Sequence, residues 1–155
     1  MTSFTRTLAG LWLACCSFQV LAKITIDDAW LRAPIALSTS VAGYMTIHNQ
    51  TGESVTLTGI SVAPEMAARA GLHQTLEKDG LMSMRPLPLP VQLAADERLA
   101  FMPGGKHIML SGLKKTLKPG DDVILTLHFS DNVNLEALFV VKSGNMQHSD
   151  HQHHD

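Results

Sequence analysis

Short runs that alternate apolar and polar residues, separated by turn residues, dominate the chain from residue 24 onward. In the clearest run, 121–129, every second residue from Val123 to Phe129 is a large apolar one. A period of two is that of a half-buried β-strand. The same criterion predicts strands at 24–32, 41–48, 55–62, 71–76, 81–85, 98–102, 106–113 and 135–142. About nine short strands predict an all-β, two-sheet Greek-key sandwich in a single domain.

Turn residues separate these strands along the chain. Asp79-Gly80 separates the runs 71–76 and 81–85, and this pair tolerates the positive φ angles of a tight hairpin. Three prolines within residues 86–90 predict an edge or a loop after the hairpin, because proline cannot donate to a strand ladder. The small residues of 64–70 predict a loop with a helical turn.

The first 22 residues have the pattern of a secretory signal. Arg6 precedes an apolar run from Leu8 to Val20, and the small residue Ala22 follows. We therefore expect cleavage after Ala22 and export to the periplasm. The alternative is a lipoprotein acylated at Cys15 or Cys16, although the residues before these cysteines fit that signal poorly. No second long apolar run exists, so we expect no integral membrane segment after cleavage.

Both cysteines of the chain lie inside this signal, so residues 23–155 contain none. That excludes a structural disulfide, a thiol nucleophile and a thiolate metal site. Without Arg6, 11 of the 12 basic residues remain against 14 acidic ones, a balance of −3. Such a balance does not suit a nucleic-acid-binding protein.

His107 and Met109 lie two apart in the predicted strand 106–113, so they point to the same face. Ile108 and Leu110 then face the core. His73 precedes the Asp-Gly hairpin and Met84 follows it, on neighbouring strands. Thioether sulfur is soft and uncharged and binds Cu(I) well, whereas imidazole suits copper in either oxidation state. Without a thiolate, a blue-copper site cannot be built, and zinc lacks its usual structural ligand.

Core packing is the competing interpretation for any single methionine. We expect Met45, Met66 and Met102 to be core residues, and His48 and His128 to be ordinary, partly buried or surface histidines. The spacing of the histidines and methionines alone leaves a copper site and accidental placement both open.

The combined spacing closely resembles the signature of the periplasmic copper chaperones called PCu(A)C. His73 is followed after ten residues by Met84, and after 22 more by His107-Ile108-Met109. The second gap is one residue longer than is usual in the family, within a proline-rich segment. The stretches 28–32, 42–45, 79–86 and 103–110 also resemble the family. A methionine that often follows the first histidine is absent here, where Met82 could help instead, although core packing is our default interpretation of Met82.

The resemblance implies a cupredoxin-like β-sandwich without the cupredoxin cysteine, and Cu(I) ligation by His73, Met84, His107 and Met109. It also implies delivery of copper to the dinuclear centre of cytochrome c oxidase subunit II, or to another oxidase copper chaperone. Transfer by ligand exchange needs no catalytic residue, so we expect a non-enzyme, and a monomer. The alternatives are periplasmic copper buffering in copper tolerance and a purely structural or adhesive sandwich.

The domain organisation expected is a signal at 1–22, a copper-binding sandwich at 23–143 and a flexible tail at 144–155. The tail lacks apolar periodicity and resembles metal-binding extensions found in part of the family. Its imidazoles suit Cu(II). Together with Met82, the secondary candidate ligands are Met146, His148, His151, His153 and His154.

Overall fold

The computed structural model describes residues 23–35 and 37–144. Within them the chain forms ten strands and one 3₁₀ turn, η1 (Ser130–Asn132). No helix in this part of the chain is long and apolar enough to cross a bilayer. The strands are β1 (Ile24–Arg32), β2 (Ser40–Asn49), β3 (Val55–Val62), β4 (Ala67–Lys78), β5 (Leu81–Pro86), β6 (Val91–Leu93), β7 (Arg98–Phe101), β8 (Lys106–Leu113), β9 (Asp122–Phe129) and β10 (Asn134–Lys142).

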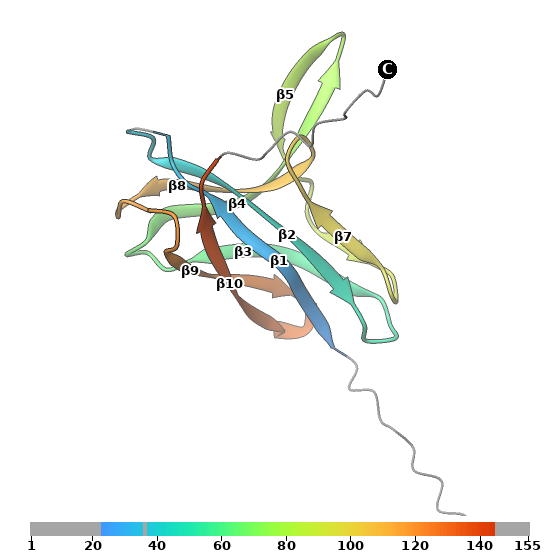
Figure 1. The fold of residues 1–155 in the computed structure, drawn as a ribbon. Coiled ribbons are helices and arrows are strands. Elements are labelled where there is room, and N and C mark those ends of the chain that lie inside the picture. Colours follow the sequence, from blue (N-terminus) through green and yellow to red (C-terminus); the bar gives the residue numbers. More distant parts are fainter. Residues whose placement is uncertain (1–22, 36, 145–155) are drawn as a thin grey trace, which may run out of the picture.

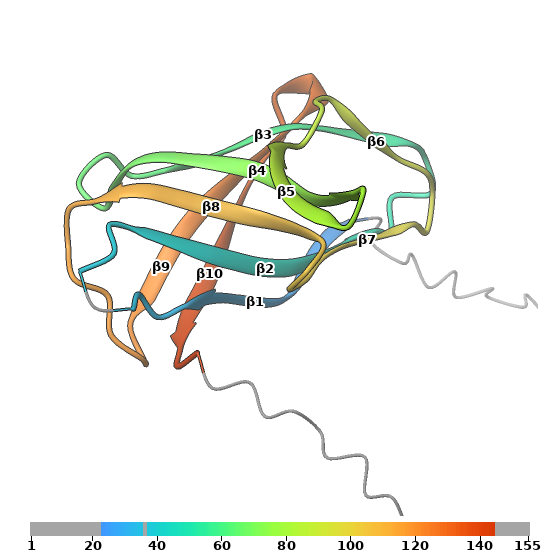
Figure 2. The same ribbon diagram turned by 90° about the horizontal axis from the view of Figure 1, so that it is seen from above.

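The strands form one continuous hydrogen-bonded path in the order β5-β4-β8-β2-β1-β10-β9-β3-β6, and β7 pairs with the end of β2. Only the β1–β10 pair is parallel among the described strands. In Figures 1 and 2, β4, β8, β2 and β1 form one layer, and β10 and β9 cross behind it. The path curls so far that β3 contacts β4. The expected all-β, cupredoxin-like domain is therefore confirmed, with its two layers joined into one sheet by the β1–β10 pair.

The core follows the alternation of the sequence. Every second residue from Val123 to Phe129 is at most 4% exposed, and Ile108 and Leu110 are fully buried, as predicted. The Asp-Gly hairpin is also confirmed, because Asp79 and Gly80 have φ angles of 54° and 75°. β5 ends at Pro86 and lies at the edge of the sheet, as the prolines indicated.

Two elements differ from the prediction. β4 begins at Ala67, where small residues had indicated a loop, because its first residues pair with the end of β8. The long partner strand overrides a weak local preference. The three-residue strand β6 was not predicted, because a run this short has no readable period; its pairing with β3 defines it.

The methionine predictions hold only in part. Met45 is 2% exposed in the core, and Met66 packs partly buried against it, as expected. Met102 and Met82, at 54% and 62% exposed, are not core residues, so that interpretation is wrong for both. Met102 lies in the turn between β7 and β8, and Met82 lies on the edge strand β5, whose hairpin projects from the body (Figure 1).

His48 and His128, the described histidines that are not candidate ligands, are partly buried, as expected. His48 lies on β2 and pairs with β1 and β7. His128 lies on β9, where its ring nitrogens are 2.7 Å from Asn134 Oδ1 and 2.7 Å from Ser61 Oγ. Both nitrogens of His128 are thus engaged in structural contacts.

Asn49 is a fully buried polar side chain at the end of β2. Its Nδ2 lies 2.7, 3.2 and 2.8 Å from the carbonyl oxygens of Glu53, Leu93 and Ala94. Its Oδ1 accepts hydrogen bonds from the backbone N–H and the hydroxyl of Thr51. One amide thereby ties the turn after β2 to the end of β6.

We predict that Asn49→Asp lowers the free energy of unfolding by about 3 kcal/mol, because a buried carboxylate cannot donate to these carbonyls. Urea denaturation followed by tryptophan fluorescence measures the change. Asn134→Asp is the matched control, since Asn134 is exposed and its Oδ1 acts only as an acceptor for His128. Equal effects of the two substitutions would contradict the prediction.

Candidate metal centre

The pairing of β4 with β8 places three of the four candidate ligands on one face of the sheet. His73 on β4 lies directly opposite His107 on β8, and Gly71 lies opposite Met109. Residues opposite one another in a ladder share a face, as do residues two apart along a strand. The side chains of His73, His107 and Met109 therefore leave the sheet on the same side, while Ile108 enters the core.

The β4–β5 hairpin adds the fourth candidate ligand. Met84 on β5 lies opposite Thr75, which is two residues beyond His73, so Met84 shares their face. His73 itself faces Pro86, so the two candidate ligands are diagonal neighbours rather than a direct pair. Met82 lies on the same face, one step further along the hairpin and opposite Glu77. Met84 is 52% exposed, which makes it the solvent-facing member of the set.

The two imidazole rings lie close together and nearly parallel, with centroids 6.0 Å apart and an interplanar angle of 20°. His107 is 6% exposed, and its Nδ1 lies 3.1 Å from the carbonyl oxygen of Gly105. A carbonyl only accepts, so in this contact Nδ1 carries the proton and donates it, which leaves the lone pair of the neutral ring on Nε2.

One nitrogen of each ring is buried without a hydrogen-bond partner among the described residues: His107 Nε2 and His73 Nδ1. Buried polar atoms in proteins are nearly always paired, and an unpaired one costs about 1–3 kcal/mol. Both unpaired atoms belong to the face that carries Met84 and Met109. A metal bound by both imidazoles would use these two nitrogens.

Gly105 holds the turn before β8 against β4. Its carbonyl oxygen accepts the backbone N–H of Thr75 at 3.2 Å as well as facing the ring of His107. The turn that orients His107 is thereby fixed to the strand that carries His73. In many metal sites, the ring nitrogen of a ligand histidine that does not bind the metal donates a hydrogen bond, and this hydrogen bond fixes the orientation of the ring.

Gly71 provides room for the ring of His73, a feature that the sequence did not reveal. A Cβ at Gly71 would lie 3.2 Å from His73 Cε1 and 3.7 Å from His73 Nδ1. Any side chain here would press on the ring next to its unpaired nitrogen. The only signal in the sequence is a glycine two residues before a histidine on one strand, which is too common to interpret alone.

A second missed feature is an aromatic pair on the adjoining strands. Trp30 on β1 and Tyr44 on β2 lie with ring centroids 4.6 Å apart. Gly43 pairs with Ile108 in the antiparallel β2–β8 ladder. Tyr44, the next residue of β2, therefore lies beside His107. Arg32 lies over Tyr44 at 5.8 Å, and Lys142 lies over Trp30 at 5.9 Å. The two cation–π contacts thus link the aromatic pair to cations at the ends of β1 and β10.

Within residues 23–35 and 37–144, no three side chains of His, Cys, Asp or Glu come together as a metal site. Among these described residues, the further ligands of a metal held by His73 and His107 would therefore come from groups other than His, Cys, Asp or Glu side chains. The secondary candidates Met146, His148, His151, His153 and His154, and the expected signal at 1–22, lie outside the described residues.

Solved structures with a similar fold include a PCuAC domain and a protein solved with Cu(I). The solution structure of CuI-DR1885 from Deinococcus radiodurans has a TM-score of 0.63 and 28% identity, and the match covers 81% of this chain and 83% of that one. The apo PCuAC domain from PmoF1 has a TM-score of 0.63 at 24% identity, and the match covers 78% and 94%. The second likeness supports the fold alone.

Two curated proteins are similar in sequence. "Putative lipoprotein Lxx21020" of Leifsonia xyli subsp. xyli is 32% identical over 77% of this chain and 69% of its own length. "Uncharacterized protein RP573" of Rickettsia prowazekii is 30% identical over 72% of this chain and 62% of its own length. Residues 24–141, which include nearly the whole described sheet, match the family described as "Putative lipoprotein LpqE-like". The chain therefore belongs to the LpqE-like family.

Proposed function

We propose that this protein is an exported Cu(I) carrier that binds one ion through His73, Met84, His107 and Met109. The observation that carries the proposal is the pair of buried, unpartnered imidazole nitrogens on the face that also carries two thioethers. The similar protein from Deinococcus radiodurans was solved as CuI-DR1885, which supports the same cargo here.

The donor set selects the ion. Two neutral imidazoles and two thioethers bring no charge and soft sulfur, which favours Cu(I) over Mg²⁺, Ca²⁺ or Zn²⁺. A site without cysteine also cannot be lost to disulfide formation in an oxidising compartment. With Nδ1 of His107 donating to Gly105, Nε2 is the atom that binds copper, and Nδ1 is the corresponding atom of His73.

The exposure of the ligands suggests the order of transfer. Met84 is half exposed on the edge strand β5, whereas His107 is buried on β8, between β4 and β2. An acceptor thiolate or thioether first replaces the sulfur of Met84, and the remaining ligands follow. The ion stays Cu(I) throughout, so the exchange needs no oxidant, reductant or proton transfer. Met82, also exposed on β5, is a candidate transient ligand. The protein acts as a carrier rather than an enzyme.

The acceptor that we propose is the dinuclear copper centre of cytochrome c oxidase subunit II, or another oxidase copper chaperone. Export follows from the signal pattern of residues 1–22, with the periplasm as the compartment. The lipoprotein names of the family and of one relative favour anchoring at Cys15 or Cys16 more than the local sequence does. We propose that the histidines of residues 144–155 form an accessory Cu(II) site.

We predict that alanine at any one of His73, Met84, His107 or Met109 weakens Cu(I) binding by more than about a hundredfold, because each substitution removes a donor atom. Competition with a chromophoric Cu(I) chelator measures the affinity, in the full chain and in a variant that lacks the tail histidines.

Met102→Ala and His48→Ala are the matched controls, because Met102 is an exposed methionine in a turn and His48 lies on a part of β2 that pairs with β7. Both should retain the affinity of the unaltered protein. Unchanged binding in His107→Ala or Met109→Ala means that the ligand assignment is wrong.

We predict that Gly71→Ala lowers the Cu(I) affinity by roughly tenfold, because metal sites tolerate displacements of only about 0.5 Å. The added Cβ displaces the ring of His73, while the free energy of unfolding changes little. Gly59→Ala is the control, since the nearest atom to its Cβ is 4.0 Å away, on His128. An affinity equal to that of Gly59→Ala would show that the position of the ring does not matter.

Delivery and copper buffering predict different phenotypes. We expect a deletion strain to lose oxidase activity at low copper, to regain it with added copper, and not to be complemented by the Met109→Ala variant. Oxidase activity of isolated membranes and growth over a range of copper concentrations are the measurements. Normal oxidase activity combined with sensitivity to high copper would favour buffering instead.

A further inference from the structure

Three connections gather at the end of the molecule away from the β4–β5 hairpin. They are the β1–β2 connection (33–35 and 37–39), the β3–β4 connection (63–66) and the β8–β9 connection (114–121). Both Figure 1 and Figure 2 place these loops together on the left and β7 on the right, whereas the β5 hairpin projects at the top of Figure 1. We call this group of loops, with the strand ends that enter it, the loop end.

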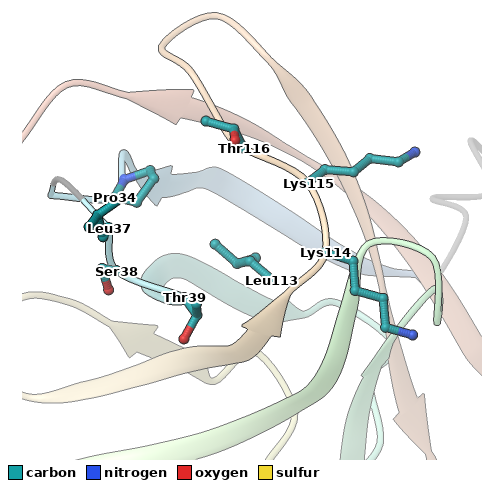
Figure 3. A pocket seen from close by; sticks show the side chains of 8 residues that line it. All are labelled: Pro34, Leu37, Ser38, Thr39, Leu113, Lys114, Lys115 and Thr116. Carbon is teal, nitrogen blue, oxygen red and sulfur yellow. The ribbon is translucent and has the colours of Figure 1, made fainter.

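The loop end carries the two most exposed large apolar side chains of the described residues. Leu37 is 98% exposed and Ile35 is 80% exposed, both in the β1–β2 connection. Leu37 borders a shallow hollow of about 230 Å³. Figure 3 shows Pro34 and Leu37 on one rim, Leu113 in the middle, and Lys114 and Lys115 on the opposite rim. Apolar side chains gathered beside polar and charged ones are a feature of surfaces that contact proteins or membranes.

Charge is distributed unevenly between the loop end and the rest of the described chain. The loop end has six cations against three carboxylates, and the remainder has five cations against nine carboxylates. The three carboxylates at the loop end are Glu65, Asp121 and Asp122, and the six cations are Arg32, Arg69, Lys114, Lys115, Lys118 and Lys142. Arg32 and Lys142 lie over the rings of Tyr44 and Trp30, and the other four cations still outnumber the carboxylates. The loop end is thus net positive on a protein whose overall charge is negative.

The loop end is well separated from the candidate copper ligands. Ala67 pairs with Leu113 at the loop end, and His73 pairs with His107 six residues further along the same ladder. At about 3.3 Å per residue, these two pairs are about 20 Å apart, and the Gly71–Met109 pair, four residues along, is about 13 Å from the loop end. A large partner could contact the loop end while Met84 and the hairpin remain accessible to another protein.

We propose that the loop end docks on the surface of an anionic phospholipid bilayer. Ile35 and Leu37 insert among the acyl chains near the headgroups, and the lysines contact lipid phosphates. Apolar side chains flanked by cations are the combination that interfacial membrane binding uses. An uncharged protein groove would match the apolar side chains but not the surplus of cations. This surface is independent of the proposed copper site, and it holds the hairpin away from the membrane.

Sedimentation with vesicles tests the proposal on residues 23–155, which contain every described strand and neither Cys15 nor Cys16. We expect binding to vesicles of phosphatidylcholine and phosphatidylglycerol in equal parts, little binding to pure phosphatidylcholine, and weakening by added salt. Leu37→Ser and Lys115→Glu should each reduce binding, the former by roughly tenfold, because burial of a leucine side chain is lost.

Leu81→Ser and Lys78→Glu are matched controls on the β4–β5 hairpin, where Leu81 is 73% exposed. They should bind anionic vesicles as the unaltered chain does. Absence of binding to the anionic vesicles, equal binding to both lipid compositions, or equal losses in the control variants would each overturn the proposal. A Cu(I) titration of Leu37→Ser separates this outcome from a failure of the proposed function, because the copper affinity should be unchanged.

Discussion

The antiparallel register between β4 and β8 is the constraint on which the candidate site depends. It sets His73 opposite His107 and Gly71 opposite Met109, so one ladder supplies two imidazoles, one thioether and the space that a ring occupies. A slip of one residue would turn His107 and Met109 into the core and Ile108 out of it. Because Ile108 and Leu110 are fully buried in the core, the same packing that stabilises the fold also prevents that slip.

Asn49 and His107 are the two buried polar side chains among the described residues, and they differ in how many of their polar atoms have hydrogen-bond partners. Asn49 has every polar atom engaged and connects loops at the end of β2. His107 uses only Nδ1, and Nε2 is left without a partner beside the equally unpartnered Nδ1 of His73. The described residues hold one more buried nitrogen without a partner, Arg32 Nε, but only the two imidazole nitrogens lie opposite one another in the β4–β8 ladder, as the proposed copper site needs.

The proposed copper site and the proposed membrane-binding surface lie at opposite ends of one sheet. The candidate copper ligands sit where β5 leaves the body, so the outermost thioether is on an edge strand and can be displaced without disturbing the core. The loop end carries exposed apolar side chains and a surplus of cations. The hydrogen-bonded strands β4 and β8 run between the two ends, so we expect docking at one end to leave the geometry of the other unchanged.

The sequence by itself determined the strand pattern, the Asp-Gly hairpin and the core face of β9, because a period of two and positive-φ turn residues are local properties. It also singled out His107 and Met109 as neighbours on one face. It could not show that His73 faces His107, that Gly71 makes room for a ring, or that Trp30 and Tyr44 adjoin the site. It placed Met82 and Met102 in the core wrongly, because apolar character alone does not say whether a second layer covers a strand. Only the pairing of distant strands decided these points, because contacts between residues far apart in the chain depend on register and curvature, which no single run of residues encodes.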